Sequence, residues 1–86
     1  MNIYSTDTMC FWGEHRSDGF HLIHEIDDDD FGLKSEWHFI LSREAEVKLF
    51  SIISEKDFVE LCRRGGTSAM IGFLDSNGIP YRRESF

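Results

Sequence analysis

Helix start and stop signals in the last third of the chain constrain the fold more than any other feature. Ser54 stands before a run with helical spacing, and Gly65 and Gly66 follow that run. Thr67 stands before a second such run, which Gly78 and Pro80 end. Serine and threonine favour the N-cap, whereas glycine and then proline favour the C-terminal end of a helix. The predicted helices span residues 55–64 and 68–76.

The side chains around these caps support the same boundaries. Ile53 and Phe58 are spaced as a hydrophobic staple across the N-cap of the first helix. At the end of the second helix, Gly78 suits a left-handed residue. Ile79 can then fold back onto Leu74, as in a Schellman motif. The sequence therefore predicts a helix, a glycine turn and a second helix that stops at a defined residue.

The first half of the chain has the shorter, aromatic-rich runs that are typical of strands. Strands are predicted over 8–12, 20–26 and 36–41, with an acidic turn over 27–32 between the last two. Alternation places Phe20, Leu22, His24 and Ile26 on one side of their strand.

Residues 43–53 fit two patterns. Residues 43–46 look helical, whereas 47–53 are rich in strand-forming residues, and a strand is favoured because Ser54 looks like a new helix start. A continuous helix over 43–64 is the alternative. Residues 81–84 form a short extended segment.

These elements predict one α+β domain over residues 1–86. It consists of a small antiparallel β-meander of three to four strands, followed by two short helices and a final short strand. The acidic, mainly β part covers residues 1–53, and the helix-turn-helix-strand part covers 54–86.

Charge is distributed unevenly between these two parts. The net charge is −7; residues 1–50 hold eleven acidic and four basic residues, and residues 51–86 hold five of each. An acidic surface repels nucleic acid and membrane headgroups, so neither is an expected partner, whereas a basic protein is. The alternative is that this charge only keeps the protein in solution.

The most acidic segment supplies the candidate partner-binding residues. Carboxylates there would steer a basic partner, and an adjacent aromatic ring would anchor it. The candidates are Glu25, Asp27, Asp28, Asp29, Asp30, Phe31, Glu36 and Trp37. Trp37 as a core residue is the competing interpretation.

Catalytic and metal-binding patterns are not recognisable. The aspartate run resembles the start of a calcium loop, with Asp27, Asp29 and Gly32 in place, but Phe31 and His38 occupy positions that should supply oxygen ligands. The two cysteines and four histidines lack the paired spacing of a zinc site. We therefore expect no enzyme activity, no cofactor and no bound metal.

The location expected for the protein follows from its first residues and its cysteines. Residues 1–20 show no signal peptide, and no apolar run is long enough to span a bilayer. The two cysteines are expected to be reduced and buried. Together these features predict a cytoplasmic protein.

The segment from Ser54 to Arg83 resembles a small phage- and prophage-encoded domain of unknown function. The resemblance rests on residues 58–61, the pair Gly65-Gly66, and the run over residues 73–83. Met70 and Phe73 stand where that family usually has glutamine and tryptophan. The resemblance covers about a third of the chain and implies a phage origin, hence a host bacterial cytoplasm.

Small acidic phage proteins without an enzyme signature are similar, as a class, to anti-CRISPR inhibitors and nucleic-acid mimics. The leading hypothesis is a non-catalytic inhibitor that blocks a basic, nucleic-acid-handling host protein, such as a defence nuclease complex. Alternatives are a phage DNA-binding regulator that uses residues 55–83, and an immunity protein against a nuclease toxin. A homodimer is left open.

Overall fold

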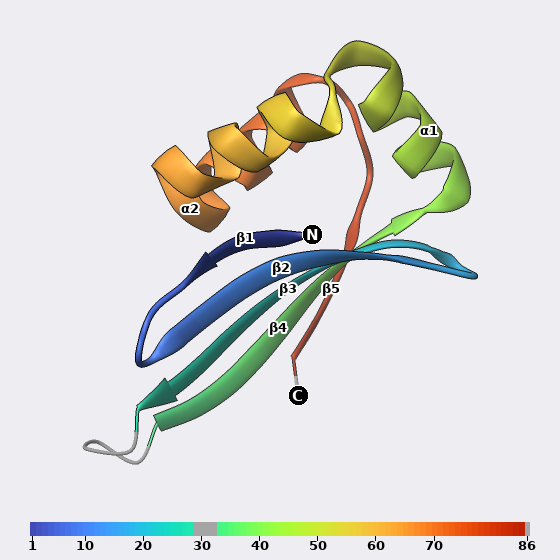
Figure 1. Cartoon of the computed structure of the whole chain (residues 1–86). Coiled ribbons are helices and arrows are strands. Elements are labelled where there is room, and N and C mark those ends of the chain that lie inside the picture. The colour runs from blue at the N-terminus through green and yellow to red at the C-terminus, as the bar shows by residue number, and fades with distance from the viewer. Residues whose placement is uncertain (29–32, 86) are drawn as a thin grey trace.

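A computed structural model of the chain combines one five-stranded sheet with two helices (Figure 1). The structure describes residues 1–28 and 33–85. The strands are β1 (Asn2–Ser5), β2 (Met9–Arg16), β3 (Gly19–Asp28), β4 (Leu33–Ser42) and β5 (Arg82–Ser85). The helices are α1 (Arg43–Ile52) and α2 (Glu55–Ser76).

The strands form an antiparallel meander in the order β1-β2-β3-β4-β5. This confirms the α+β class, the meander, the two helices and the final strand. The meander is wider than expected, because β1 adds an edge strand that pairs with β2. It is also longer, because β2 continues through Gly13 to Arg16. Only Ser17 and Asp18 separate β2 from β3.

The strand predicted over 47–53 is wrong, because this segment belongs to α1. Ser42 caps the helix: its Oγ accepts a hydrogen bond from the backbone N–H of Ala45 at 3.2 Å. Ala45 and Leu49, one helical turn apart, are buried. Val47 favours strands, but its side chain is 63% exposed and makes no contribution to the core that would hold this segment in a strand. Ile53 has extended backbone angles, which also excludes a continuous helix over 43–64.

The caps predicted at Ser54 and at Gly78 are confirmed. The Ser54 Oγ accepts a hydrogen bond from the Asp57 N–H at 3.1 Å. α2 is broken at Gly66, whose φ of 66° and ψ of −157° are not helical. At the C-terminal end, Gly78 has a φ of 63°, and the Ile79 N–H donates to the Leu74 carbonyl at 2.9 Å. α2 is therefore two helical segments joined at a glycine, as the sequence indicates.

The core lies between the sheet and the helices, which both cover the same face of the sheet (Figure 1). Phenylalanine and leucine dominate the core on the sheet side: Phe11, Phe20, Leu22, Phe39 and Leu41. The helices contribute Leu49, Phe58, Cys62, Met70 and Leu74. Both cysteines are free; Cys62 is fully buried, and its burial raises the pKa of the thiol to about 12, whereas Cys10 is only half-buried.

His15 connects the sheet to both helices. Its Nδ1 lies 2.9 Å from a carboxylate oxygen of Glu46 in α1, and its Nε2 lies 2.5 Å from one of Glu55 in α2. The ring also packs 4.8 Å from that of Phe20, measured between centroids. The hydrogen bond to Glu46, followed by that to Glu55, raises the pKa of His15. Only the protonated imidazole donates from both nitrogens, so the positive form completes this His15 bridge.

The His15 bridge predicts a pH-dependent part of the stability. The pKa of His15 is higher in the folded protein than in the unfolded chain, where it is about 6.5. The contribution of His15 to the free energy of unfolding is therefore fully present below about pH 6.5 and is lost as the pH rises through the folded pKa. The His15 side chain is half exposed, so we expect no more than about 1 kcal/mol. Urea unfolding from about pH 5 to about pH 9 measures it against the His15→Gln variant.

The difference in stability between the wild type and His15→Gln measures the contribution of His15 alone. Burial lowers the pKa of His24, which favours folding above the unfolded pKa and acts in the opposite direction. This contribution is common to the wild type and the variant, so it cancels in the difference. A difference in stability that does not change with pH would contradict the His15 bridge.

Candidate functional site

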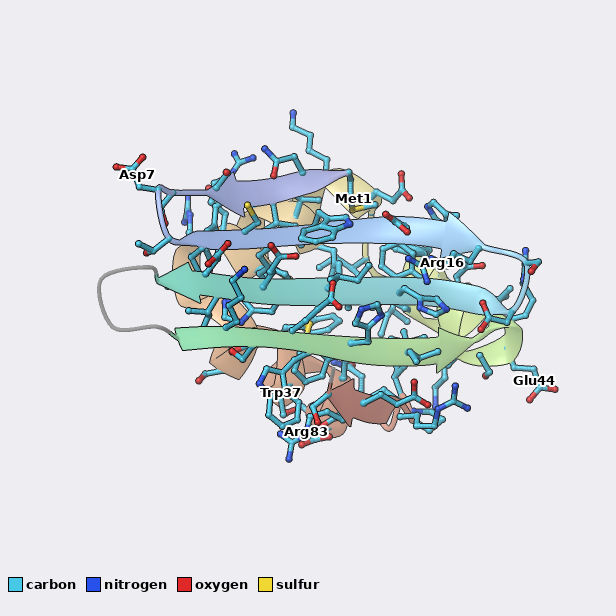
Figure 2. All side chains as sticks on the ribbon, turned by 90° about the horizontal axis from the view of Figure 1, so that it is seen from below. Met1, Asp7, Arg16, Trp37, Glu44 and Arg83 are labelled. Carbon is cyan, nitrogen blue, oxygen red and sulfur yellow. The ribbon has the colours of Figure 1, made fainter. Side chains whose placement is uncertain are left out.

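The face of the sheet opposite the helices carries the candidate site. Figure 2 looks onto this face, with the helices behind the sheet. We call it the open face. Alternation and the strand register place on it Cys10, Trp12, Glu14, Arg16, His21, Ile23, Glu25, Asp27, Lys34, Glu36, His38, Ile40, Arg82 and Glu84.

The centre of the open face is packed although both helices lie on the other side. His21, Ile23, His38 and Ile40 are each 8% exposed or less. Trp12 lies directly across from Ile23, and Ile23 from His38, so these three side chains form a row across β2, β3 and β4. The burial comes from neighbouring side chains on the same face. The centre is therefore an apolar and aromatic layer rather than a fully hydrated surface.

Charged pairs surround much of this centre. The Trp12 indole N–H donates to Glu14 at 2.9 Å, and the Arg16 guanidinium lies 2.6 Å from the same carboxylate. These contacts, the Trp12 bond first, lower the pKa of Glu14. His21 Nε2 lies 2.9 Å from Asp18 and lowers the pKa of that carboxyl. A further pair is Arg82 with Glu84, at 2.9 Å.

One end of the open face concentrates carboxylates. Glu25 of β3 lies directly opposite Glu36 of β4, and Asp27 lies opposite Lys34. We call Glu25, Asp27 and Glu36 the acidic end. These residues line a shallow pocket of about 210 Å³ together with Ile26, Lys34 and Ser35. Like charges directly opposite in a sheet repel each other, so a cation bound here would offset that repulsion. Glu36 also lies 3.6 Å from the imidazole of His38.

The structure brings together only some of the predicted binding residues. Glu25, Asp27 and Glu36 share the acidic end, and Asp28 is the last residue of β3. Residues 29–31, with the predicted Asp29, Asp30 and Phe31, lie outside the described residues. Trp37 follows Glu36 in the strand and therefore lies on the helix-covered face.

Trp37 is consequently separated from the carboxylates that it was expected to accompany. It is 37% exposed, so it is not a core residue either. The aromatic residue that does share a face with Glu25 and Glu36 is Trp12. The sequence analysis does not single out Trp12, because the strand predicted over 8–12 ends at this residue. Continued alternation through Glu14 and Arg16 is the signal that would have placed it.

The arginines of the C-terminal part are largely engaged within the chain. Arg63 donates to the Ile3 carbonyl at 2.9 Å and lies 3.6 Å from Glu60. Arg64 lies 2.9 Å from the same Glu60. The second segment of α2 carries no lysine or arginine. This arrangement offers little positive surface to a DNA backbone.

In the described parts of the chain, no three histidine, cysteine or acidic side chains gather closely enough to hold a metal ion. Over the same residues, neither helix combines the length and the apolar character needed to cross a membrane. Comparison of the chain with protein-family models, with curated proteins and with solved structures finds no match.

Proposed function

We propose that the protein is a non-catalytic inhibitor that binds a basic protein through the open face of its sheet. Its partner would be a host protein that handles nucleic acid, such as a defence nuclease complex, which has a basic surface where nucleic acid normally lies. The sequence resemblance to a phage-encoded domain supports a phage origin. Blocking such a surface requires no catalytic group and no cofactor, only shape and charge.

The direct pairing of Glu25 with Glu36 is the observation that carries this proposal. Two carboxylates on adjacent strands, with Asp27 beside them, create a local negative potential at an accessible end of the sheet. Lysine or arginine from a partner would replace the repulsion between them with attraction. Glu14 and Glu84 are paired with arginines. At the acidic end, His38 lies 3.6 Å from Glu36, and Lys34 lies opposite Asp27. Three carboxylates and one lysine line the pocket there, so negative charge is in excess.

The rest of the open face has the anatomy of a protein interface. Protein interfaces combine a desolvated centre, often aromatic, with a polar rim. Here Trp12 lies beside the buried Ile23 and His38, and charged pairs lie around them. The Trp12 indole is held by Glu14, so little side-chain entropy remains to be lost on binding. Trp12 is therefore the anchor that we propose in place of Trp37.

Charge reversal at the acidic end tests the proposal. The partner is first recovered from a host lysate with the wild-type protein and identified. In the double variant Glu25→Lys/Glu36→Lys, we expect association with that partner at low salt to slow by about tenfold or more, because long-range steering is lost. The rate constants are measured by stopped-flow mixing at low and at high salt, and the difference between the proteins should shrink at high salt.

A matched double variant controls for net charge. Glu44→Lys/Asp75→Lys makes the same change in charge on the helices, where both side chains are exposed. It should leave association nearly unchanged. Equal slowing in both double variants would show that only the total charge matters, and unchanged kinetics in the first variant would reject the acidic end.

The two alternative functions predict different results. A DNA-binding regulator would form a complex in a gel shift at low salt and would lose affinity when Arg82 and Arg83 become alanine. An immunity protein would recover a nuclease toxin as its partner. Absence of a DNA complex at low salt removes the first of these alternatives.

A further inference from the structure

Arg83 differs from the other arginines of this acidic protein. Each other arginine that the structure describes has a carboxylate oxygen within 4.0 Å: Arg16, Arg43, Arg63, Arg64 and Arg82. Among the described residues, Arg83 has no such partner. Its guanidinium carbon lies instead 5.3 Å from the centre of the Trp37 ring. The cation is thus placed on an aromatic ring and keeps its hydrogen-bond donors for another group.

A pocket lies beside this pair, on the helix-covered side of the sheet. It has a volume of about 270 Å³, and Trp37 and Arg83 both line it. In Figure 2 the two labelled side chains lie together at the β4–β5 edge. Ile26, Phe39 and Ile71 give the pocket apolar walls. We call this the Arg83 pocket.

The polar groups of the Arg83 pocket favour an anion. Thr67 lines it and is the first residue after the break at Gly66, where a new helical segment begins. The N-terminal end of a helix carries partial positive charge and has free N–H groups. His24 also lines the pocket; burial lowers the pKa of its imidazole, which keeps this group neutral near pH 7. Arg83 is therefore the charged group of the described lining, and it is positive.

The size and shape of the Arg83 pocket limit the ligand further. Pockets for drug-sized ligands hold about 300–1,000 Å³, so this one suits a body no larger than about one aromatic ring. The flat Trp37 ring and the apolar walls favour a planar or branched apolar group. A carboxylate matches the two-pronged donor geometry of a guanidinium.

From this arrangement we infer that the Arg83 pocket binds a carboxylate attached to a compact apolar group. Arg83 pairs with the carboxylate, and the apolar group lies against Trp37 between Ile26, Phe39 and Ile71. The ligand is either a free small acid or the last residue of a peptide chain, which present the same chemistry. The inference is independent of the acidic end, which lies on the other face of the sheet.

Titration with phenylacetate, followed by NMR of ¹⁵N-labelled protein, tests the inference. We expect saturable shifts of the Trp37 indole N–H and of the Arg83 side-chain N–H. The Trp12 indole lies on the open face and should not shift, so it serves as an internal control. Phenylacetamide has nearly the same shape without the charge, and we expect it to bind at least about tenfold more weakly.

Neighbouring arginines provide matched variants. Arg82 is adjacent to Arg83, but it faces the open side and pairs with Glu84. We expect Arg83→Gln to weaken phenylacetate binding by at least about tenfold and Arg82→Gln by less than about twofold. Both variants keep the fold, because both side chains are exposed; unchanged amide spectra outside β5 verify this.

A second ligand distinguishes a free small acid from the C-terminal residue of a peptide chain as the source of the carboxylate. N-acetylphenylalanine mimics the end of a peptide, and tighter binding than that of phenylacetate indicates a chain terminus, whereas weaker binding indicates a free acid. Three results would overturn the inference: no saturable shift at Trp37, equal affinity for the acid and the amide, or equal losses in the two arginine variants. None of these results bears on binding of a partner by the acidic end.

Discussion

Replacement of Gly19 by alanine is expected to destabilise the fold by at least about 3 kcal/mol. Gly19 follows the two-residue turn between β2 and β3 and has a φ of 139°, which side chains of L-residues rarely permit. A Cβ atom built there would lie 2.0 Å from the backbone carbonyl oxygen of Leu41. Because that oxygen belongs to the neighbouring strand β4, relief requires a shift of the sheet itself. Urea unfolding monitored by circular dichroism measures the loss.

Gly72 is the matched control for this substitution. It lies inside α2, and a Cβ built on it meets nothing within 4 Å apart from its chain neighbours and the adjacent backbone of its own helix. Alanine there is expected to stabilise the protein by about 0.5–1 kcal/mol, because it restricts the unfolded chain and favours a helix. Similar effects of the two substitutions would contradict the close approach of β3 and β4 at Gly19.

Truncation of Phe58 to alanine is expected to cost about 3–5 kcal/mol. Phe58 is fully buried in the first turn of α2, and its ring packs against Phe50 of α1 and Phe73 of the second segment of α2. The substitution would leave a cavity at the point where all three helical segments meet. The free energy of unfolding from urea titrations measures the effect.

Val47 provides the control in the neighbouring helix. It is 63% exposed, and alanine is the better helix former, so Val47→Ala should change stability by less than about 0.5 kcal/mol. A loss below about 1 kcal/mol for Phe58→Ala would show that the two helices do not share one core with the sheet.

The parts of this fold that the sequence predicts well are those determined by adjacent residues. Ser54, Gly66 and Gly78 act on the backbone within one helical turn, so their effect is visible in a short window of sequence. The same holds for the alternation that places Phe20 and Leu22 in the core. These features need no knowledge of distant segments.

The parts that were missed depend on contacts between distant segments. α1 is a helix because Ala45 and Leu49 are buried against the sheet, and this overrides the strand propensity of residues 47–53. β1 consists of only four residues, Asn2–Ser5, too few for a recognisable pattern, and it exists because the edge of β2 is available to pair with it.

The candidate sites show the same division. Glu25 and Glu36 lie opposite each other on one face, as their place in the predicted acidic patch requires. Trp37 is next to Glu36 in the sequence, but strand alternation turns it to the other side. Arg83 lies against Trp37 only because β5 pairs with β4. The two residues are far apart in the sequence, so no short window of sequence contains both.

The alternation of Glu36 and Trp37 along β4 has a consequence for assembly. Two molecules recognised by these neighbouring residues would approach from opposite directions and would be separated by the thickness of a single sheet. They would not compete for space, so both could be bound at the same time. Displacing one of them would leave the other in place.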